Sequence, residues 1–275
     1  MVDLDLIRRA LAEDLAGGQD ITSVATVSGS ESVVADFVAR KPGVIAGVEM
    51  AVATLREVGV IDIQVHLSDG DQVEAGSVLM TVRGDTRAIL LAERTALNFL
   101  GHLGGIATMT HIWVQAIAGT ACTIRDTRKT TPGMRLLEKA AVVAGGGANH
   151  RLSLSESALI KDNHIAAAGG VSAAFSKVRA AFPSVFIEIE VDSLDQLKEV
   201  ATQSPDLVLL DNMTPAQCKE AVTFVAGRFK LEASGGISLE NAKAYAESGV
   251  DYLAIGALTH SAPVLDIGLD MKLEI

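Results

Sequence analysis

The stretch FIEIEVDSLDQLKEVATQSPDLVLLDN, residues 186–212, predicts a strand, a helix and a second strand in succession. Its outer runs, FIEIEVD and DLVLLDN, are short and mainly apolar, whereas SLDQLKEVA between them has a helical pattern. Four similar short runs occur on either side of this stretch: CTIRDT, ALIKDNH, KLEASGG and YLAIGAL. Strands that alternate with helices predict parallel βαβ units, and about six or seven such units can close into a barrel.

The part of the chain before residue 105 has a different, mixed pattern. Helices are expected at residues 4–15 and 48–58, and strands at residues 31–39, 61–67 and 77–84. A long helical pattern then runs from residue 86 to about residue 118, and Gly104 and Gly105 interrupt it. We therefore expect two domains: an N-terminal α+β sandwich over residues 1–105, joined by residues 266–275, and a catalytic α/β barrel over residues 106–265.

Composition limits the class of protein. The chain has a formal net charge of −11, and 49% of its residues are hydrophobic while 4% are aromatic, which is typical of soluble α/β proteins with aliphatic cores. No run approaches the roughly 18 apolar residues of a membrane span, and the start, MVDLDLIRRALAEDL, lacks the apolar stretch of a signal peptide. The acidic balance argues against a nucleic-acid surface. We therefore expect a cytoplasmic protein with no membrane or nucleic-acid partner.

Polar residues or glycines follow every predicted strand of the barrel. In barrel enzymes the chemistry lies at the carboxyl ends of the strands, on the loops that follow them. Solvated loops would explain any one of these positions, but runs such as LVLLD and FIEIE do not require every charge at the same end. The candidate residues at these ends are Arg128, Lys129, Lys161, Asp162, Glu190, Asp211, Ser234, Gly235, Gly236, Gly256 and His260.

The last two loops have the composition of a phosphate site. The glycine-rich turns ASGGISLEN and AIGALTHSAP expose backbone N–H groups, which form a phosphate cradle together with a helix N-terminus. Glu190 and Asp211 end consecutive predicted strands, so their carboxylates could hold Mg²⁺, which takes one or two carboxylates plus substrate phosphates. As an alternative, the two acids could cap helices, with Asp192 as a competing cap. We favour the metal site.

Cations gather in the first part of the barrel, around DTRKTTPG at residues 126–133. Arginine presents a planar fork suited to carboxylates, whereas lysine is a point charge suited to phosphates. Solvated surface cations are the alternative, but so many cations beside glycine turns in an acidic chain favour a site for a multiply charged anion. The cations of this region are Arg125, Arg128, Lys129, Arg135, His150, Arg151, Lys161 and His164.

Two mechanistic classes fit these residues. Lys161 or Lys129 could form a Schiff base, which needs an unprotonated amine. Asp162 beside Lys161 favours the protonated amine instead. Transfer of a phosphorylated sugar uses the phosphate cradle, the two acids for Mg²⁺ and the cations for an anionic acceptor. We therefore favour group transfer.

Motifs along most of the chain resemble one known family. DTRKTTPG, GGGANHRL, ALIKDNHI, IEIEVDS, LLDNM, EASGGIS and VDYLAIGALTHSAPVLDIGLD are similar to the quinolinate phosphoribosyltransferases, the carboxylating nicotinate-nucleotide pyrophosphorylases of NAD biosynthesis. EDLAGGQDIT and ARKPGVIAG resemble the family more loosely. The resemblance implies an incomplete TIM-like barrel of about six or seven strands. It also implies transfer of phosphoribosyl from phosphoribosyl pyrophosphate to quinolinate with decarboxylation, giving nicotinate mononucleotide, pyrophosphate and CO₂, with Mg²⁺ on the donor.

The resemblance also implies roles for individual residues. The quinolinate-binding cations would be Arg94, Arg128, Lys129, His150, Arg151 and Lys161. The sugar-phosphate clamp would comprise Ser234, Gly235, Gly256 and His260. Glu190 and Asp211 would lie on the ribose and metal side. The candidate catalytic residues are Lys129, Lys161, Glu190 and Asp211. In the family, the counterpart of Arg94 reaches into the neighbouring subunit's barrel, which implies a homodimer with shared active sites.

Two other functions stay open at this point. One is a close paralogue that acts on another small acid, and the other is a non-catalytic protein that binds small anions. A paralogue should show changes among the carboxylate-binding cations, and none is visible. A binding protein would not need both Glu190 and Asp211.

Overall fold

The computed structural model describes residues 2–272 and divides the chain into two compact units. The first unit holds residues 2–111, 136–146 and 261–272, and the second holds residues 112–135 and 147–260. The sequence predicts a single boundary after residue 105 and a C-terminal contribution from residue 266, whereas three separate segments form the first unit. Residue 1 and residues 273–275 of the expected first domain lie outside the described residues.

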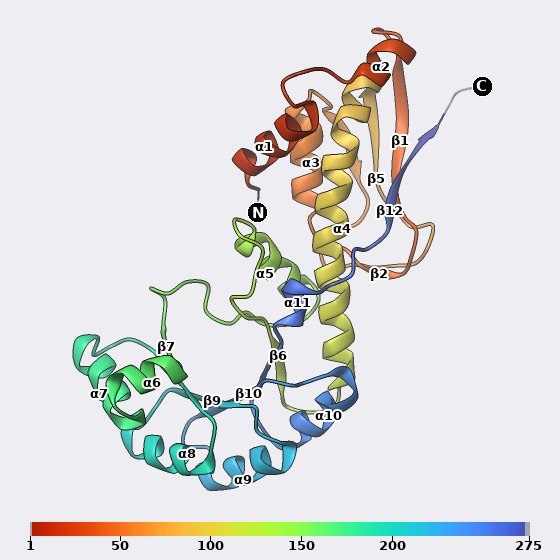
Figure 1. The fold of residues 1–275 in the computed structure, drawn as a ribbon. Coiled ribbons are helices and arrows are strands. Elements are labelled where there is room, and N and C mark those ends of the chain that lie inside the picture. Colours follow the sequence, from red (N-terminus) through yellow and green to blue (C-terminus); the bar gives the residue numbers. More distant parts are fainter. Residues whose placement is uncertain (1, 273–275) are drawn as a thin grey trace. The chain divides into compact units, whose positions relative to one another are not determined.

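A four-stranded antiparallel sheet is the centre of the first unit (Figure 1). Its strands, in spatial order, are β12 (Ile267–Lys272), β1 (Ser32–Ala39), β5 (Val78–Asp85) and β3 (Asp62–Val65). The short strands β2 (Gly43–Val44) and β4 (Gln72–Val73) pair separately. The helices are α1 (Leu4–Leu15), α2 (Ile21–Thr26), α3 (Val48–Glu57) and most of α4 (Thr86–Ala116) and α5 (Arg135–Ala144).

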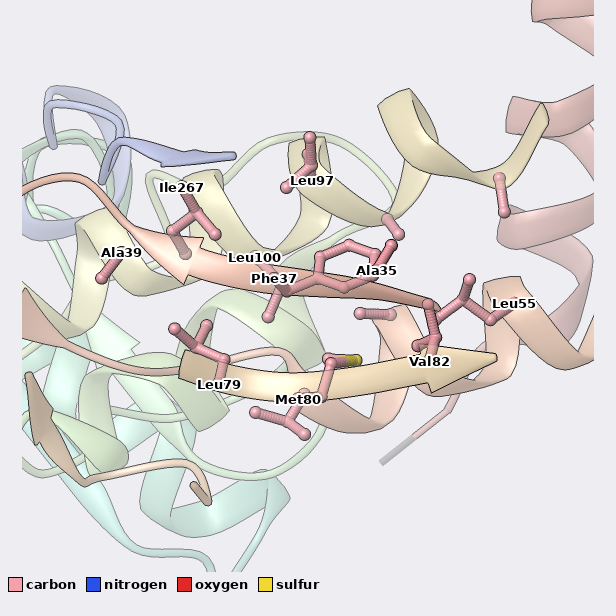
Figure 2. Close-up of a cluster of buried hydrophobic side chains, with 14 of the residues drawn as sticks. Ala35, Phe37, Ala39, Leu55, Leu79, Met80, Val82, Leu97, Leu100 and Ile267 are labelled. Atoms are coloured by element: carbon pink, nitrogen blue, oxygen red, sulfur yellow. The ribbon is translucent and has the colours of Figure 1, made fainter. Parts of the chain in front are cut away.

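Hydrophobic burial holds this sheet to α3 and α4 (Figure 2). Phe37 of β1 lies directly opposite Met80 of β5, and both side chains are fully buried. Leu55 of α3 and Leu100 of α4 are fully buried in the same cluster. Each side chain of this size stabilises the folded state by about 1.5–3 kcal/mol relative to an exposed one.

Helix α4 is continuous, so the expectation that Gly104 and Gly105 interrupt it is wrong. The two glycines serve close packing instead. A Cβ on Gly105 would overlap the carbonyl oxygen of Pro263, and a Cβ on Gly104 would lie 3.0 Å from Leu265 Cδ2. The two adjacent glycines in a helical pattern therefore do not end the helix. They mark the face of α4 on which residues 263–265 lie.

We predict that Gly105→Ala lowers the midpoint of thermal unfolding, although alanine favours helix by about 1 kcal/mol. The added methyl group meets backbone, which cannot rotate away, and overpacking of this kind costs about 1–3 kcal/mol. Gly104→Ala is the matched control, because the one tight contact of its methyl group is with the end of the Leu265 side chain, and the carbonyl oxygen of Val44 lies at an ordinary contact distance of 3.4 Å. Differential scanning calorimetry of both variants measures the difference. Equal stability of the two would contradict this account of the glycines.

The second unit contains a six-stranded parallel sheet with the order β6-β11-β10-β9-β8-β7. Its strands are β6 (Thr123–Arg125), β7 (Ala158–Ile160), β8 (Ile187–Val191), β9 (Leu207–Asp211), β10 (Lys230–Ser234) and β11 (Tyr252–Ala254). The first and last strands in sequence, β6 and β11, are paired, whereas among residues 2–272 no ladder joins β6 to β7. The sheet therefore forms an incomplete α/β barrel, as expected.

Helices cover the outer side of these strands (Figure 1). They are α6 (Asp162–Ala168), α7 (Val171–Ala181), α8 (Leu194–Val200), the 3₁₀ turn η1 (Ala201–Gln203), α9 (Pro215–Val225) and α10 (Leu239–Glu247). The short helix α11 (Ala257–His260) follows β11 at the carboxyl ends of the strands. Ser193 caps α8 and Thr214 caps α9. The helices that follow β8 and β9 are therefore capped without Glu190 or Asp211, which leaves both acids for the barrel rim.

No helix within residues 2–272 is long and apolar enough to cross a bilayer.

Candidate active site

The carboxyl ends of the second unit's strands line one cavity of about 750 Å³. Because all the strands are parallel, the loops that follow them meet at the same rim of the barrel. Every predicted site residue except Arg94 lines this cavity: Arg128, Lys129, His150, Arg151, Lys161, Glu190, Asp211, Ser234, Gly235, Gly256 and His260.

Arg128 and Arg151 form an electropositive part of the lining. Arg151 Nη1 donates to the carbonyl oxygen of Ser157 at 2.6 Å. Within the described chain, the buried Nε atoms of both arginines have no hydrogen-bond partner. Burial, and then the charge of Arg128, lower the pKa of the Arg151 guanidinium. A buried donor without an acceptor lowers the stability of the fold, and the oxygens of a bound anion would supply the missing acceptors. This corner therefore favours an anion.

Glu190 and Asp211 form a second, acidic part of the lining, at the ends of the neighbouring strands β8 and β9. Lys161 Nζ lies 3.7 Å from Glu190 Oε2. Burial raises the pKa of the Glu190 carboxyl, and the charge of Asp211 raises it further, whereas the Lys161 ammonium lowers it. A divalent cation near these two acids would relieve their repulsion, so the pair fits Mg²⁺ held partly by substrate phosphates.

The turn after β10 combines tight packing with exposed backbone. Gly235 has φ +85° and Gly236 has φ +63°, in the left-handed region that favours glycine. A Cβ on Gly235 would overlap Oδ1 of Asn212, whereas a Cβ on Gly236 would meet open space. Asn212, which the sequence analysis missed, thus fixes how closely this turn approaches β9.

A hydrogen bond joins the turn after β11 to the loop after β6. Thr259 Oγ1 donates to the carbonyl oxygen of Lys129 at 2.8 Å. A Cβ on Gly256 would lie 3.1 Å from Lys129 Cδ and 3.3 Å from His260 Nε2. The absence of a side chain at Gly256 therefore lets Lys129 and His260 lie next to the same glycine-rich turn.

A group of buried charges lies beneath the rim. His150 Nε2 is 2.8 Å from Glu188 Oε2 and 3.5 Å from Glu232 Oε1, and Arg125 Nη1 is 2.7 Å from Glu232 Oε2. Burial raises the pKa of Glu188 and of Glu232 to about 7 each, and the neighbouring carboxylate adds to the shift of Glu232. Neither acid is among the residues predicted from the sequence, although the alternation in IEIEV places Glu188 on the same inward face as Glu190.

Three cations of the predicted cluster have other partners. Arg125 pairs with Glu232 and lies 4.6 Å over the ring of Tyr252. Arg135 donates to Thr130 and to the carbonyl oxygen of Leu152. The ring of His164 accepts from the backbone N–H of Lys161. Arg94 belongs to the first unit, where its exposed side chain pairs with Glu93.

A second large cavity, of about 760 Å³, belongs to the first unit. Its charged lining residues are Glu49, Arg56, Glu57 and Asp69, among apolar side chains. It therefore lacks the group of cations that an anion site needs.

Comparison with known proteins assigns the family. Residues 106–270 match the model of the quinolinate phosphoribosyl transferase C-terminal domain, and residues 20–104 match that of the N-terminal domain. The chain belongs to the quinolinate phosphoribosyltransferase family. It is 52% identical to the nicotinate-nucleotide pyrophosphorylase [carboxylating] of Mycobacterium leprae, over 97% of this chain and 96% of the relative. The probable enzyme of the same name from Bacillus subtilis is 41% identical, over 98% of this chain and 93% of the relative.

The same fold occurs in solved structures. The nicotinate-nucleotide pyrophosphorylase of Ehrlichia chaffeensis superimposes with a TM-score of 0.91 at 37% identity, over 98% of both chains. Human nicotinic acid phosphoribosyltransferase, at 14% identity and a TM-score of 0.66, covers 97% of this chain and 74% of its own and shares the fold. The family assignment thus agrees with the parallel barrel and its polar rim.

We predict that Gly235→Ala weakens the binding of inorganic phosphate by about tenfold, because strain at such a position costs on the order of 1–3 kcal/mol and the methyl group displaces Asn212. Gly236→Ala has a similar backbone but open space, and it should weaken binding less. Isothermal titration calorimetry measures both affinities, with circular dichroism as the check on folding. Equal losses in the two variants would contradict a role for Gly235 packing in the anion site.

Proposed function

We propose that the cavity binds quinolinate at its arginine corner and phosphoribosyl pyrophosphate across its acidic and glycine-rich parts. The chain is a decarboxylating phosphoribosyltransferase, which transfers phosphoribosyl to quinolinate and gives nicotinate mononucleotide, pyrophosphate and CO₂. This arrangement rests on one observation: two arginines with buried, unpaired Nε donors and a pair of carboxylates line the same cavity.

The acceptor site follows from the arginine corner. Quinolinate is a pyridine with two neighbouring carboxylates, and Arg128 and Arg151 each offer a buried, unpartnered Nε donor. Arginine forks match carboxylates, and such charge-assisted hydrogen bonds are stronger than neutral ones. Lys129 and Lys161 supply further positive charge along the lining. The corner therefore favours a dianion over a monoanion.

The donor site follows from the acids and the glycine turns. The backbone of Gly235, Gly236 and Gly256 would hold the ribose phosphate, with Ser234 and His260 beside it. Glu190 and Asp211 would hold Mg²⁺ together with the donor's own oxygens. When bound, Mg²⁺ neutralises charge on the pyrophosphate leaving group.

The chemistry then depends mainly on position and charge. Departure of pyrophosphate builds positive charge on the ribose, which the Glu190 carboxylate stabilises. The acceptor's ring nitrogen forms the new bond to the ribose carbon. The resulting pyridinium stabilises the carbanion left when the 2-carboxylate departs as CO₂, and a proton takes its place. The protein binds and orients both substrates and excludes water.

Schiff-base chemistry is disfavoured by the surroundings of Lys161. Its ammonium lies 3.7 Å from the Glu190 carboxylate, and an ion pair holds the proton that a nucleophilic amine must lose. Group transfer needs Lys161 only as a cation.

A homodimer with shared active sites is part of the proposal. The Arg94 side chain is 69% exposed, and it pairs with the adjacent Glu93 at 3.2 Å. Such a cation is available to a second copy of the chain. The cytoplasmic location expected from the sequence stays a prediction.

We predict that the purified protein converts quinolinate in the presence of donor and Mg²⁺, and that it uses nicotinate at least about a hundredfold less efficiently. An acceptor that lacks one carboxylate leaves a buried cation unpaired, and such a loss discriminates strongly. Chelation of Mg²⁺ should stop the reaction and excess Mg²⁺ should restore it. Chromatographic measurement of nicotinate mononucleotide tests all three. Comparable turnover of nicotinate, or binding without any product, would reject the assignment.

We predict that Arg94→Ala abolishes activity while leaving the dimer intact, and that a mixture of this variant with inactive Lys161→Ala regains activity. In a mixed dimer, one shared site receives both substitutions and the other receives neither. Recovery should reach about a quarter of wild-type activity if subunits mix at random and sites are independent. Activity and light scattering are measured on the same mixture. An active monomer, or no recovery after verified subunit exchange, would place Arg94 outside a shared site.

A further inference from the structure

His150 is held on three sides by groups of the second unit. Its backbone N–H donates to Asp126 Oδ1 at 2.8 Å. Its Nδ1 atom accepts from the backbone N–H of Arg151 at 2.8 Å. Its Nε2 atom lies 2.8 Å from Glu188 Oε2. The residue is 6% exposed, so these protein contacts account for both ring nitrogens.

These contacts fix the tautomer. A backbone N–H is always a donor, so Nδ1, which faces the N–H of Arg151, must carry a lone pair and no proton. A neutral imidazole carries one ring proton, so with Nδ1 unprotonated the proton lies on Nε2, which is 2.8 Å from Glu188 Oε2. The ring is therefore the neutral Nε2–H form.

This tautomer argues against a metal ion. Within the described residues, His150, Glu188 and Glu232 are the one group of three whose ligand atoms lie within 4.8 Å of one another. A metal on Nε2 would need a lone pair there and would leave the second ring nitrogen to donate a hydrogen bond. Here the second ring nitrogen accepts one instead. Arg125, 2.7 Å from Glu232, already supplies a positive charge.

The same contacts argue against His150 as a cation that binds quinolinate, the role implied by the family resemblance. A neutral ring with both nitrogens engaged has neither a positive charge nor an unused donor to offer. His150 instead affects the site through Arg151. The His150 ring accepts a hydrogen bond from the Arg151 backbone, and Arg151 lines the cavity.

We propose that His150 is a positioning residue, held as the neutral Nε2–H tautomer by Glu188 and Glu232, and that this buried group keeps Arg151 directed at the acceptor corner. The contacts connect the loop after α5 to β8 through Glu188 and to β10 through Glu232. Arg125 completes the group from β6, so three strands of the barrel fix one loop position. The identity of the ligand at Arg151 rests on the proposed function, whereas the tautomer of His150 is independent of it.

The first test needs no substrate, so its result is independent of the proposed function. Nitrogen NMR of ¹⁵N-histidine in the full-length protein at neutral pH distinguishes the ring forms, and His150→Gln identifies the His150 signals among the six histidines. We expect a protonated Nε2 and an unprotonated Nδ1. An imidazolium, the Nδ1–H tautomer, or one zinc ion retained per chain after dialysis against zinc would overturn the proposal.

The second test separates positioning from charge. Glu188→Leu leaves the Nε2–H without its acceptor and should raise KM for quinolinate about tenfold, with KM for the donor nearly unchanged. Glu188→Gln keeps an amide oxygen for Nε2–H and an N–H₂ toward Glu232, so KM for quinolinate should stay within about threefold of wild type. Ile189→Val, a buried change at the next position of β8, is the matched control and should alter neither KM.

Three results would contradict the positioning role. Equal losses in Glu188→Gln and Glu188→Leu would show that the negative charge itself is needed, as for an imidazolium or a metal. An unchanged KM for quinolinate in Glu188→Leu would show that the acceptor site does not depend on this group. Equal increases in both KM values would indicate general damage to the barrel. If Glu188→Leu does not fold, the NMR result and the Glu188→Gln kinetics still decide.

Discussion

The parallel direction of the six strands in the second unit is the constraint on which the site depends. Parallel pairing places every strand's carboxyl end at one rim, so residues scattered from Arg128 to His260 line one cavity. Parallel strands also need helical crossovers, and these helices cover the outer side of the strands. Chemistry can therefore vary in the rim loops while the hydrophobic strands, such as LVLLD in β9, stay buried.

The burial of individual charged groups, and not the net charge of the chain, decides where this protein can bind an anion. An acidic chain still builds an anion site, because Arg128 and Arg151 retain buried donors that protein groups leave unmet. Glu190 and Asp211 line the same cavity, and their neighbouring carboxylates favour a cation there. In the proposed function, the anionic acceptor pairs with the arginines, and Mg²⁺ held with the phosphorylated donor pairs with the acids. The free energy lost in burying the two arginine Nε donors without acceptors is thus regained when an anionic substrate binds.

Sequence patterns predicted the rim well because strand ends follow from local rules. Short apolar runs that end in polar residues placed Lys161, Glu190 and Asp211 without knowledge of three-dimensional contacts. The glycines of α4 were misread, because local rules treat Gly104 and Gly105 as helix breakers, whereas their reason lies in the distant segment 263–265. The two family models meet at residue 105, where the sequence places its boundary. Residues 136–146 group with the first unit through tertiary contacts, which local patterns do not contain. Roles for single residues, such as Arg94, came from the family resemblance and not from spacing.

Glu188 and Glu190 are given different roles by the two proposals, positioning for Glu188 and ligand binding for Glu190, and their depth in the barrel is what separates them. They occupy consecutive inward-facing positions of β8, and no sequence rule distinguishes them. One residue is 2% exposed and contacts His150; the other has a side chain 14% exposed, reaches the cavity and lies near Lys161. Depth along a barrel strand therefore sorts identical side chains into two layers. The upper layer, with Glu190, faces the cavity, so its charged partners change when substrates bind and leave. The lower layer, with Glu188, contacts protein groups that are always present. Only the lower layer can therefore hold a loop in one conformation whether or not substrate is bound.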